Sequence, residues 1–132
     1  LGVEVRVACA KGYETNSILI NQARKIYKND NLLKIMHDPN TAVKGANVLY
    51  TDVWSSMGEE SKKEEKDKDF NGFTIDNDLV NKANKDAIIL HCLPAYRNKE
   101  IIDAVIESDK SRIFDQAENR LHAQQALLAC MF

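Results

Sequence analysis

The run Ala87-Ile88-Ile89-Leu90 is wholly apolar and leads directly into His91-Cys92-Leu93-Pro94. A short strand without polar alternation is typical of a parallel sheet whose two faces are both covered. In such sheets, ligands bind beyond the carboxyl ends of the strands. The stretch therefore predicts a layered α/β fold with functional side chains just after this strand.

Segments on both sides of this run alternate between strand and helix patterns. Strands are predicted over residues 3–9, 32–36, 47–53 and 112–114. Helical spacing marks 15–29, 101–106 and 117–132, and Asp38-Pro39 and Asp76 are suited to begin two further helices. We expect one domain over residues 1–132, a three-layer α/β/α arrangement around a parallel, Rossmann-like doubly wound sheet of about five strands.

The composition is that of an ordinary globular domain with nearly balanced charge. The 132 residues are 44% hydrophobic, and 18 Lys and Arg against 20 Asp and Glu give a formal charge of −2. This balance disfavours nucleic acid or an anionic membrane as a partner. No apolar run approaches the roughly 20 residues of a membrane span. The chain begins without Met and without a signal-like segment, so we allow for an N-terminus further upstream.

The three cysteines, Cys9, Cys92 and Cys130, are an odd number and form no CxxC pair. A disulfide framework or a thiolate zinc site is therefore disfavoured, and a reducing compartment is expected. The histidines show no metal-ligand spacing, and the five glycines form no phosphate-binding loop. We expect neither a metal nor a nucleotide cofactor.

Residues 59–69 are a separate compositional feature. Ten of these eleven residues are charged, six of them acids and four of them lysines. Such a segment has no apolar face to bury, so we expect a solvated, mobile loop.

Three of the predicted strands end in polar residues that would meet at one edge of the sheet. Asp52 follows the third strand, Cys92 follows the fourth, and Arg120 follows the fifth. Because the carboxyl ends of parallel strands share an edge, a carboxylate, a thiol and a guanidinium converge there. The combination predicts a site for a small charged molecule.

Each of these residues also has a purely structural interpretation. Asp52 could cap or turn the chain, and Cys92 could be a small buried hydrophobe. His91 could satisfy backbone groups, and Arg120 could pair with an acid on its own helix turn. Their joint position at one edge favours the functional interpretation.

A cysteine hydrolase is a weaker alternative. A Cys92 nucleophile needs a neighbouring base. His91 is adjacent in sequence and so points to the opposite face of the strand, and nothing in the sequence places His37 or His122 beside the thiol.

Three longer motifs surround the candidate residues. They are Asp52-Val53-Trp54-Ser55-Ser56-Met57-Gly58, His91-Cys92-Leu93-Pro94-Ala95 and the run Phe-Asp-Gln-Ala-Glu-Asn-Arg-Leu-His-Ala-Gln at 114–124. In sequence, order and spacing they resemble the ornithine carbamoyltransferase family, and Lys11-Gly12-Tyr13-Glu14 resembles the segment after the first strand of that family's second domain. The resemblance covers nearly the whole chain.

The resemblance implies the C-terminal, ornithine-binding half of a two-domain enzyme that uses no cofactor. That enzyme joins carbamoyl phosphate to the side-chain amine of ornithine and yields citrulline and phosphate, a step of arginine metabolism. Its first domain supplies a Ser-Thr-Arg-Thr phosphate loop and a His-Pro-x-Gln motif, and this chain contains neither. The resemblance therefore implies a chain that is inactive alone, an intact homotrimer held largely through the first domain, and a location in the cytoplasm, or in the mitochondrial matrix of a eukaryote.

The roles implied by the resemblance divide between the two substrates. Asp52 holds an ammonium group of ornithine, and Ser56 and the backbone of Met57 bind its amino-acid end. Cys92 lies beside the reacting amine.

On the carbamoyl phosphate side, the resemblance places the Cys92-Leu93 backbone near the carbamoyl group and lets Arg120 reach carbamoyl phosphate. An amine must lose a proton before it attacks a carbonyl carbon. We therefore also expect Asp52 and Cys92 to act as proton acceptors.

The same motifs distinguish among the substrates of the wider family. Aspartate enzymes have no use for a carboxylate that faces an ammonium group, and the Ser-Met-Gly loop favours free ornithine over N-acetylornithine. A putrescine carbamoyltransferase half stays open, as does a non-catalytic small-molecule-binding or assembly module of the same fold.

Three further features of the sequence are compared with the pattern of the family. Asn98 stands where the ornithine enzymes commonly have Gly. The charged stretch 59–69 lies in the loop that closes over substrate in the family. The last seven residues, 126–132, are all apolar, and the family's last helix returns to the first domain. We predict exposed apolar area at this end and weak self-association.

Overall fold

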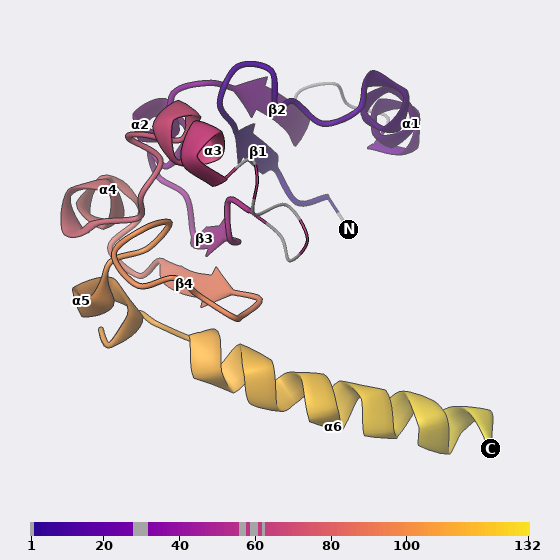
Figure 1. The fold of residues 1–132 in the computed structure, drawn as a ribbon. Helices are drawn as coiled ribbons and strands as arrows, with labels where there is room; N and C mark the ends of the chain where they lie inside the picture. Colours follow the sequence, from indigo (N-terminus) through magenta and orange to yellow (C-terminus); the bar gives the residue numbers. More distant parts are fainter. Residues whose placement is uncertain (1, 28–31, 56–57, 59–60, 62) are drawn as a thin grey trace.

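The computed structural model describes residues 2–27, 32–55, 58, 61 and 63–132. Its elements follow in the order β1 (Val5–Ala8), α1 (Ser17–Tyr27), β2 (Leu33–Met36), α2 (Pro39–Ala42), β3 (Val48–Thr51), α3 (Lys63–Asp69), α4 (Asn77–Lys82), β4 (Ile88–His91), α5 (Asp103–Ile106) and α6 (Ile113–Met131). Strands and helices alternate along the chain (Figure 1), which confirms the predicted α/β class.

The described strands form two parallel pairs. β1 pairs with β2, with Val5 opposite Leu33, and β3 pairs with β4, with Val48 opposite Ile88. The sequence predicted one sheet of about five strands, whereas the described residues form four strands in two pairs. A cleft of about 780 Å³ lies between β1 and β3.

The predicted fifth strand at 112–114 is wrong. Ser111 makes a single parallel bridge with Ile89, and the amide of Arg112 donates to the Ile89 carbonyl at 2.9 Å. The chain then enters α6 at Ile113, whose side chain is completely buried. Residues beyond 112 satisfy their backbone groups within α6, so only a bridge remains beside β4.

The charged segment is helical over its described part. α3 has Glu64 and Glu65 in its first turn and Lys66 and Lys68 in its last, which suits the helix dipole. The prediction of a mobile loop is therefore wrong for 63–69, and residues 59, 60 and 62 lie outside the described residues. Opposite charges one turn apart favour the helix, and Lys99 and Tyr13 contact its Asp67 and Asp69 from outside, although it buries no side chain.

Two helices begin at the capping residues that the sequence predicted. The Asp38 carboxylate accepts hydrogen bonds from the amides of Asn40 and Thr41 at 3.0 and 3.1 Å, and so caps α2. The Asp76 carboxylate accepts from the Leu79 amide at 2.8 Å and caps α4.

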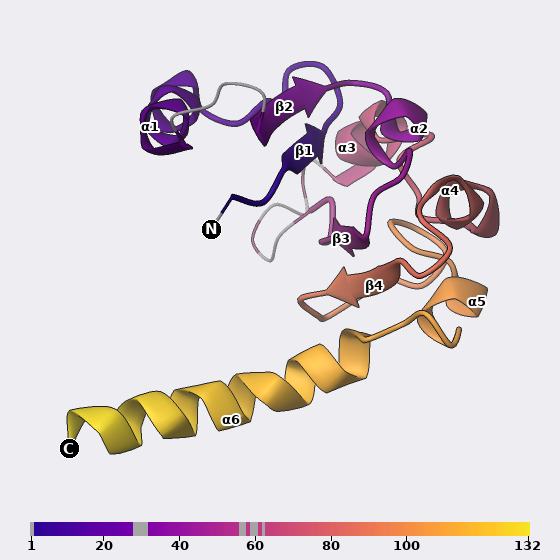
Figure 2. The same cartoon turned by 180° about the vertical axis from the view of Figure 1, so that it is seen from behind.

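The hydrophobic core lies among β3, β4, α4, α5 and the start of α6. Its members are Val43, Leu49, Ile75, Leu79, Val80, Ala87, Ile89, Ile101, Val105, Ile106 and Ile113. α1 lies beyond β2, on the opposite side of the molecule from α6 (Figures 1 and 2). This arrangement leaves both helices with large exposed areas.

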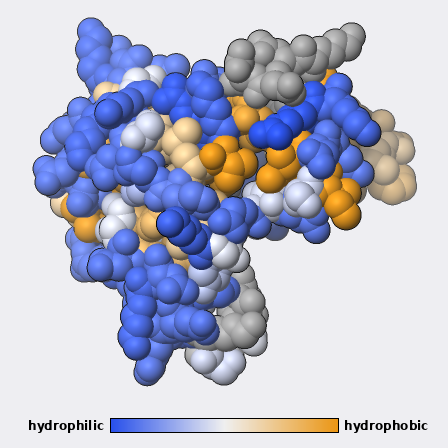
Figure 3. All heavy atoms as spheres, turned by 90° about the horizontal axis from the view of Figure 1, so that it is seen from above, coloured by the Kyte–Doolittle hydropathy of each residue, from blue (hydrophilic) through white to orange (hydrophobic). Residues whose placement is uncertain are grey.

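Hydrophobic side chains reach the surface in several places. From above, they emerge between broader hydrophilic areas (Figure 3). On α6, Leu127, Leu128 and Met131 are more than half exposed, and Phe132 is fully exposed. The predicted exposed apolar area is confirmed, and self-association stays a prediction. Within the described ranges, no helix is both long and apolar enough to cross a membrane.

Candidate functional site

The ends of β3 and β4 bring Asp52 and Cys92 together. Thr51 is the pairing partner of His91, so the residues that follow leave the two strands side by side. The Asp52 side chain is exposed and its Oδ1 accepts from the Val53 amide at 2.7 Å, while Cys92 is half-buried. The carboxylate and the thiol therefore meet at the predicted edge.

The contact between these two groups acts on the thiol. Burial raises the pKa of Cys92, and hydrogen bonding and charge repulsion from Asp52 raise this pKa further. A hydrogen bond from Tyr50 acts in the opposite direction, and the net pKa is raised. At neutral pH, Cys92 is therefore held as a thiol that can donate a hydrogen bond to Asp52.

Tyr50 is a member of this cluster that sequence reasoning missed. It lies two residues before Asp52 on β3, so both side chains point to the same face of the strand. The Gln116 side-chain amide donates to the Tyr50 hydroxyl at 3.0 Å and thus ties the first turn of α6 to the site. The alternation of side chains along β3 is the sequence signal that could have identified Tyr50.

Arg120 lies one turn beyond Gln116 on α6, with an exposed side chain. Its two neighbouring acids are oriented elsewhere: Glu118 faces His122 at 3.7 Å, and Asp115 faces Arg112 at 3.8 Å. Over the described part of the chain, no ion pair holds Arg120, so the structural interpretation of Arg120 as a local ion-pair partner finds no support. Nor does the structure bring its guanidinium into contact with Asp52 or Cys92.

Ser56 and Met57 lie outside the described residues. The loop that leads to them is anchored by Trp54, whose ring stacks on Phe70 at a centroid distance of 5.8 Å. Phe70 also meets Tyr13 edge-on at 4.9 Å. The Ser55 hydroxyl oxygen is buried and has no hydrogen-bond partner among the described groups.

The cleft between β1 and β3 reaches this anchored loop. Asp52, Trp54 and Phe70 form part of its wall, together with Glu4 and Arg6. It thus offers a carboxylate at an aromatic-lined opening, which suits a small molecule that carries a cationic group.

The three histidines do not serve Cys92 as bases. His91 is completely buried on the other face of β4, where its Nδ1 accepts from the Leu93 amide at 2.8 Å. His37 Nδ1 lies 2.9 Å from the Cys9 carbonyl oxygen, and His122 faces its own helix. The structural interpretation of His91 is confirmed, and a cysteine hydrolase finds no support in this arrangement.

Leu93 follows Cys92 with a backbone φ of +55°, in the left-handed region that is uncommon for a residue other than glycine. The Leu93-Pro94 peptide is cis. The turn after β4 thus has a specific backbone shape at Leu93 and Pro94.

Within the described ranges, no group of three or more His, Cys, Asp or Glu side chains is arranged to hold a metal ion. The candidate chemistry rests on the carboxylate, the thiol and the backbone of the turn after β4.

Comparison with known proteins places these features in a family. Residues 1–131 match the family model described as aspartate/ornithine carbamoyltransferase, Asp/Orn binding domain. An ornithine carbamoyltransferase of Prochlorococcus marinus subsp. pastoris is 77% identical over 131 residues, which are 99% of this chain and 42% of that protein. The chain thus spans about two-fifths of the length of the curated relatives it matches.

Solved structures agree with this assignment. The ornithine carbamoyltransferase from Pyrococcus furiosus is 47% identical, with a TM-score of 0.88 over 96% of this chain and 41% of that chain. An acetylornithine transcarbamylase complexed with acetylcitrulline is 29% identical, with a TM-score of 0.81 over 97% of this chain and 40% of that chain. From its motifs, fold and relatives together, the chain belongs to the aspartate/ornithine carbamoyltransferase family and comprises the Asp/Orn-binding domain.

Proposed function

We propose that this chain is the ornithine-binding half of an ornithine carbamoyltransferase. Together with a carbamoyl phosphate-binding first domain, it transfers the carbamoyl group of carbamoyl phosphate to ornithine, giving citrulline and phosphate. The intact enzyme is proposed to be a cytoplasmic homotrimer. The relatives that match over nearly the whole chain support this function.

The observation that carries the proposal is the meeting of Asp52 and Cys92 at the ends of two neighbouring parallel strands. Asp52 is an exposed carboxylate in the wall of the cleft, so it is available to an ammonium group. Ornithine supplies such a group at each end, whereas aspartate brings a second carboxylate that Asp52 would repel.

The chemistry assigns different roles to the two groups. The neutral amine of ornithine attacks the carbamoyl carbon, a C–N bond forms, the C–O bond to phosphate breaks, and the amine loses a proton. Asp52 is the better acceptor for that proton, because the raised pKa of Cys92 keeps the thiol protonated. Cys92 then acts beside the amine as a hydrogen-bond donor.

The remaining contacts are proposed from the family motifs. Ser56 and the backbone of Met57 bind the amino-acid end of ornithine. The Cys92-Leu93 backbone approaches the carbamoyl group, and Arg120 reaches carbamoyl phosphate once the first domain is present. In this arrangement, cationic groups stabilise the charge that grows on oxygen during the attack.

An NMR titration of the chain with L-ornithine tests the proposal. We expect shifts at Asp52 and Cys92, and their loss in Asp52→Asn, which keeps the shape of the side chain but removes its charge. L-Aspartate and N-acetylornithine serve as controls and should give no comparable response. Equal shifts with putrescine would move the assignment to a diamine substrate.

A second assay tests catalysis. Addition of the first domain of the Prochlorococcus marinus relative should restore citrulline formation to the wild-type chain but not to Asp52→Asn. Ornithine binding without any restored turnover would favour a non-catalytic binding module. Absence of both binding and turnover would contradict the proposed function.

A further inference from the structure

The two most deeply buried polar side chains of the described residues form a pair directly beneath the site. His91 is fully buried and Glu100 is 1% exposed, and His91 Nε2 lies 3.2 Å from Glu100 Oε1. A buried carboxylate is unfavourable unless hydrogen bonds compensate it. Neither residue has a part in the proposed chemistry, so the pair requires another explanation.

The hydrogen bonds of His91 determine its tautomer. Nδ1 accepts from the Leu93 amide at 2.8 Å, so Nδ1 carries no proton. Nε2 must then carry the proton and donates it to Glu100. Glu100 therefore acts on the Leu93 amide through the imidazole ring.

The Leu93 backbone needs such a restraint. Its φ of +55° is an unfavourable conformation for a leucine and persists only where surrounding contacts impose it. The His91-to-Leu93 hydrogen bond spans this turn and holds it closed around Cys92. Without the bond, the Cys92-Leu93 backbone is free to relax toward an ordinary conformation.

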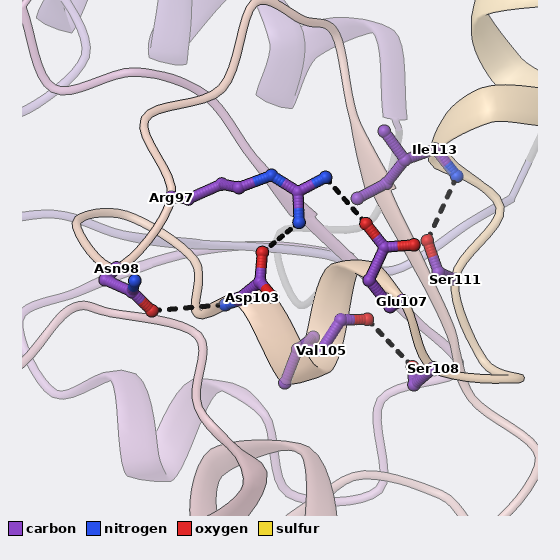
Figure 4. Close-up of polar contacts among 8 residues, drawn as sticks. All are labelled: Arg97, Asn98, Asp103, Val105, Glu107, Ser108, Ser111 and Ile113. Atoms are coloured by element: carbon purple, nitrogen blue, oxygen red, sulfur yellow. Dashed lines mark hydrogen bonds and ion pairs between the residues drawn. The ribbon is translucent and has the colours of Figure 1, made fainter.

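Glu100 is itself fixed from several sides. Its Oε1 also accepts from the Tyr96 amide at 2.6 Å, and its backbone carbonyl accepts from the Ile75 amide at 2.9 Å. Three residues earlier in the chain, Arg97 pairs with Asp103 of α5 and with Glu107, the residue that follows this helix (Figure 4). Hydrogen bonds therefore hold both the carboxylate and the backbone of Glu100.

Glu100 also borders the other loop of the site. A small cavity of about 10 Å³ has Glu100, Trp54 and Ser55 in its wall. The carboxylate thus lies between the turn after β4 and the loop that follows Asp52.

We propose that Glu100 is a positioning residue of the carbamoyl transfer site: acting through His91, it fixes the Cys92-Leu93 turn in its left-handed shape. This inference rests on the proposed function, since it assigns the turn to the reacting carbamoyl group. Asp52 follows a different strand, β3, so ornithine binding depends on Glu100 far less than turnover does.

The first test is spectroscopic and uses the chain alone. In the wild type, ¹⁵N spectra should show His91 with an unprotonated Nδ1 and a protonated Nε2, and the Leu93 amide should be protected from exchange. Glu100→Ala should abolish that protection and mix the tautomers. Glu100→Gln keeps an oxygen acceptor for His91 and Tyr96, so it should retain most of both signals.

The second test measures function after addition of the first domain of the Prochlorococcus marinus relative. Glu100→Ala should lower kcat about tenfold to a hundredfold, the size expected from a displaced reacting group. Its ornithine Kd should change by less than about threefold, whereas Asp52→Asn should raise that Kd strongly. Ile106→Ala, a core truncation in α5 that removes no hydrogen bond of His91 or Glu100, controls for lost stability and should leave kcat of the folded protein unchanged.

The outcomes separate this inference from the function on which it rests. If the wild type fails to bind ornithine, the proposed function fails, while the His91 and Leu93 signals still report on the pair. If Glu100→Ala keeps the Leu93 protection or wild-type kcat, the positioning role is overturned. If Glu100→Ala does not fold, Glu100→Gln decides: rescue of the Leu93 signal and of kcat supports the role, and loss of both contradicts it.

Discussion

Two parts of this molecule differ in how deeply their side chains are buried. We call β1, α1, β2 and α2 the N-terminal part, and the elements from β3 to α6 the C-terminal part. Among the described residues, ten of the eleven members of the core cluster belong to the C-terminal part, and the other, Val43, ends α2. Cys9, Ala10 and Ala42 are also buried but lie outside this cluster, every residue of β1 is only half-buried, and most of α1 is exposed. The C-terminal part therefore has its own core, and the N-terminal part lies against it across an open cleft.

The difference in burial between the two parts explains where the site residues lie. Asp52 and Cys92 follow the two strands of the packed part, and Glu100 and His91 are buried beneath them. A reacting geometry must be held to a fraction of an ångström, which a well-packed base can do. The N-terminal part supplies the other wall of the cleft, with Glu4 and Arg6 among its lining residues.

The largest expected effect is on the core itself. Ile89→Ala removes a side chain that is 1% exposed and should lower the free energy of unfolding by about 2–5 kcal/mol. Ile35→Ala makes the same change in the half-buried β2 and should cost less than about 2 kcal/mol. Urea unfolding measures both losses. Equal losses would contradict the difference in burial between the two parts.

A smaller effect is expected at Asn98, whose φ is +64°. Asn is among the residues that tolerate this conformation, and its side-chain oxygen also accepts from the Asp103 amide at 3.3 Å. Asn98→Ala should lower the unfolding free energy by about 1–2 kcal/mol. Asn98→Gly should be close to neutral in the same thermal or urea experiment. A larger loss for Gly than for Ala would show that the backbone conformation is not the cause.

At the boundary between the two parts, Asp52 should control the reactivity of Cys92. Because the pKa of Cys92 is raised, little thiolate is present at neutral pH, and alkylation should be slow. Asp52→Asn removes one cause of the raised pKa, so alkylation should become several-fold faster. Tyr50→Phe removes a hydrogen bond that lowers the pKa and should have the opposite effect. Mass spectrometry of the Cys92 peptide over time measures these rates, and unchanged rates in both variants would refute the contact.

The smallest effect is expected in the N-terminal part, at the cap of α2. Hydrogen bonds from Thr41 and Asn40 lower the pKa of Asp38 below its ordinary value of 3.8. The stability that Asp38 contributes is therefore full above that value and is lost as the pH falls through the lowered pKa. The difference in melting temperature between wild type and Asp38→Ala should be small at neutral pH and should close in acid. A difference that persists at the lowest pH would assign the effect to something other than the charge.

Much of this molecule follows from local sequence patterns. The strands at 5–8, 33–36, 48–51 and 88–91 lie within the predicted segments or extend them by one residue. The caps at Asp38 and Asp76 and the meeting of Asp52 with Cys92 were also predicted. These features depend on side-chain alternation, on a cap and its nearest amides, and on the rule that parallel strands share an edge.

The predictions that failed have a common physical origin. Residue 113 was expected in a strand, but its burial at the start of α6 depends on contacts with distant parts of the core. The charged stretch was expected as a loop because it lacks an apolar face, but α3 is also held from outside the segment by Tyr13, which contacts Asp69, and by Lys99, which contacts Asp67. In both cases, contacts with residues distant in the sequence decided the local structure, and composition and periodicity do not show such contacts.

The sequence by itself determined the strands at 5–8, 33–36, 48–51 and 88–91, the helix caps at Asp38 and Asp76, and the motifs that identify the family. Only the tertiary structure decided that the strands form two pairs, that Tyr50 meets Gln116 across 66 residues, and that Glu100 lies beneath His91. Periodicity and capping report on neighbours within one or two turns of the chain. The burial of a carboxylate against an imidazole depends on how segments pack in space, and no local pattern carries that information.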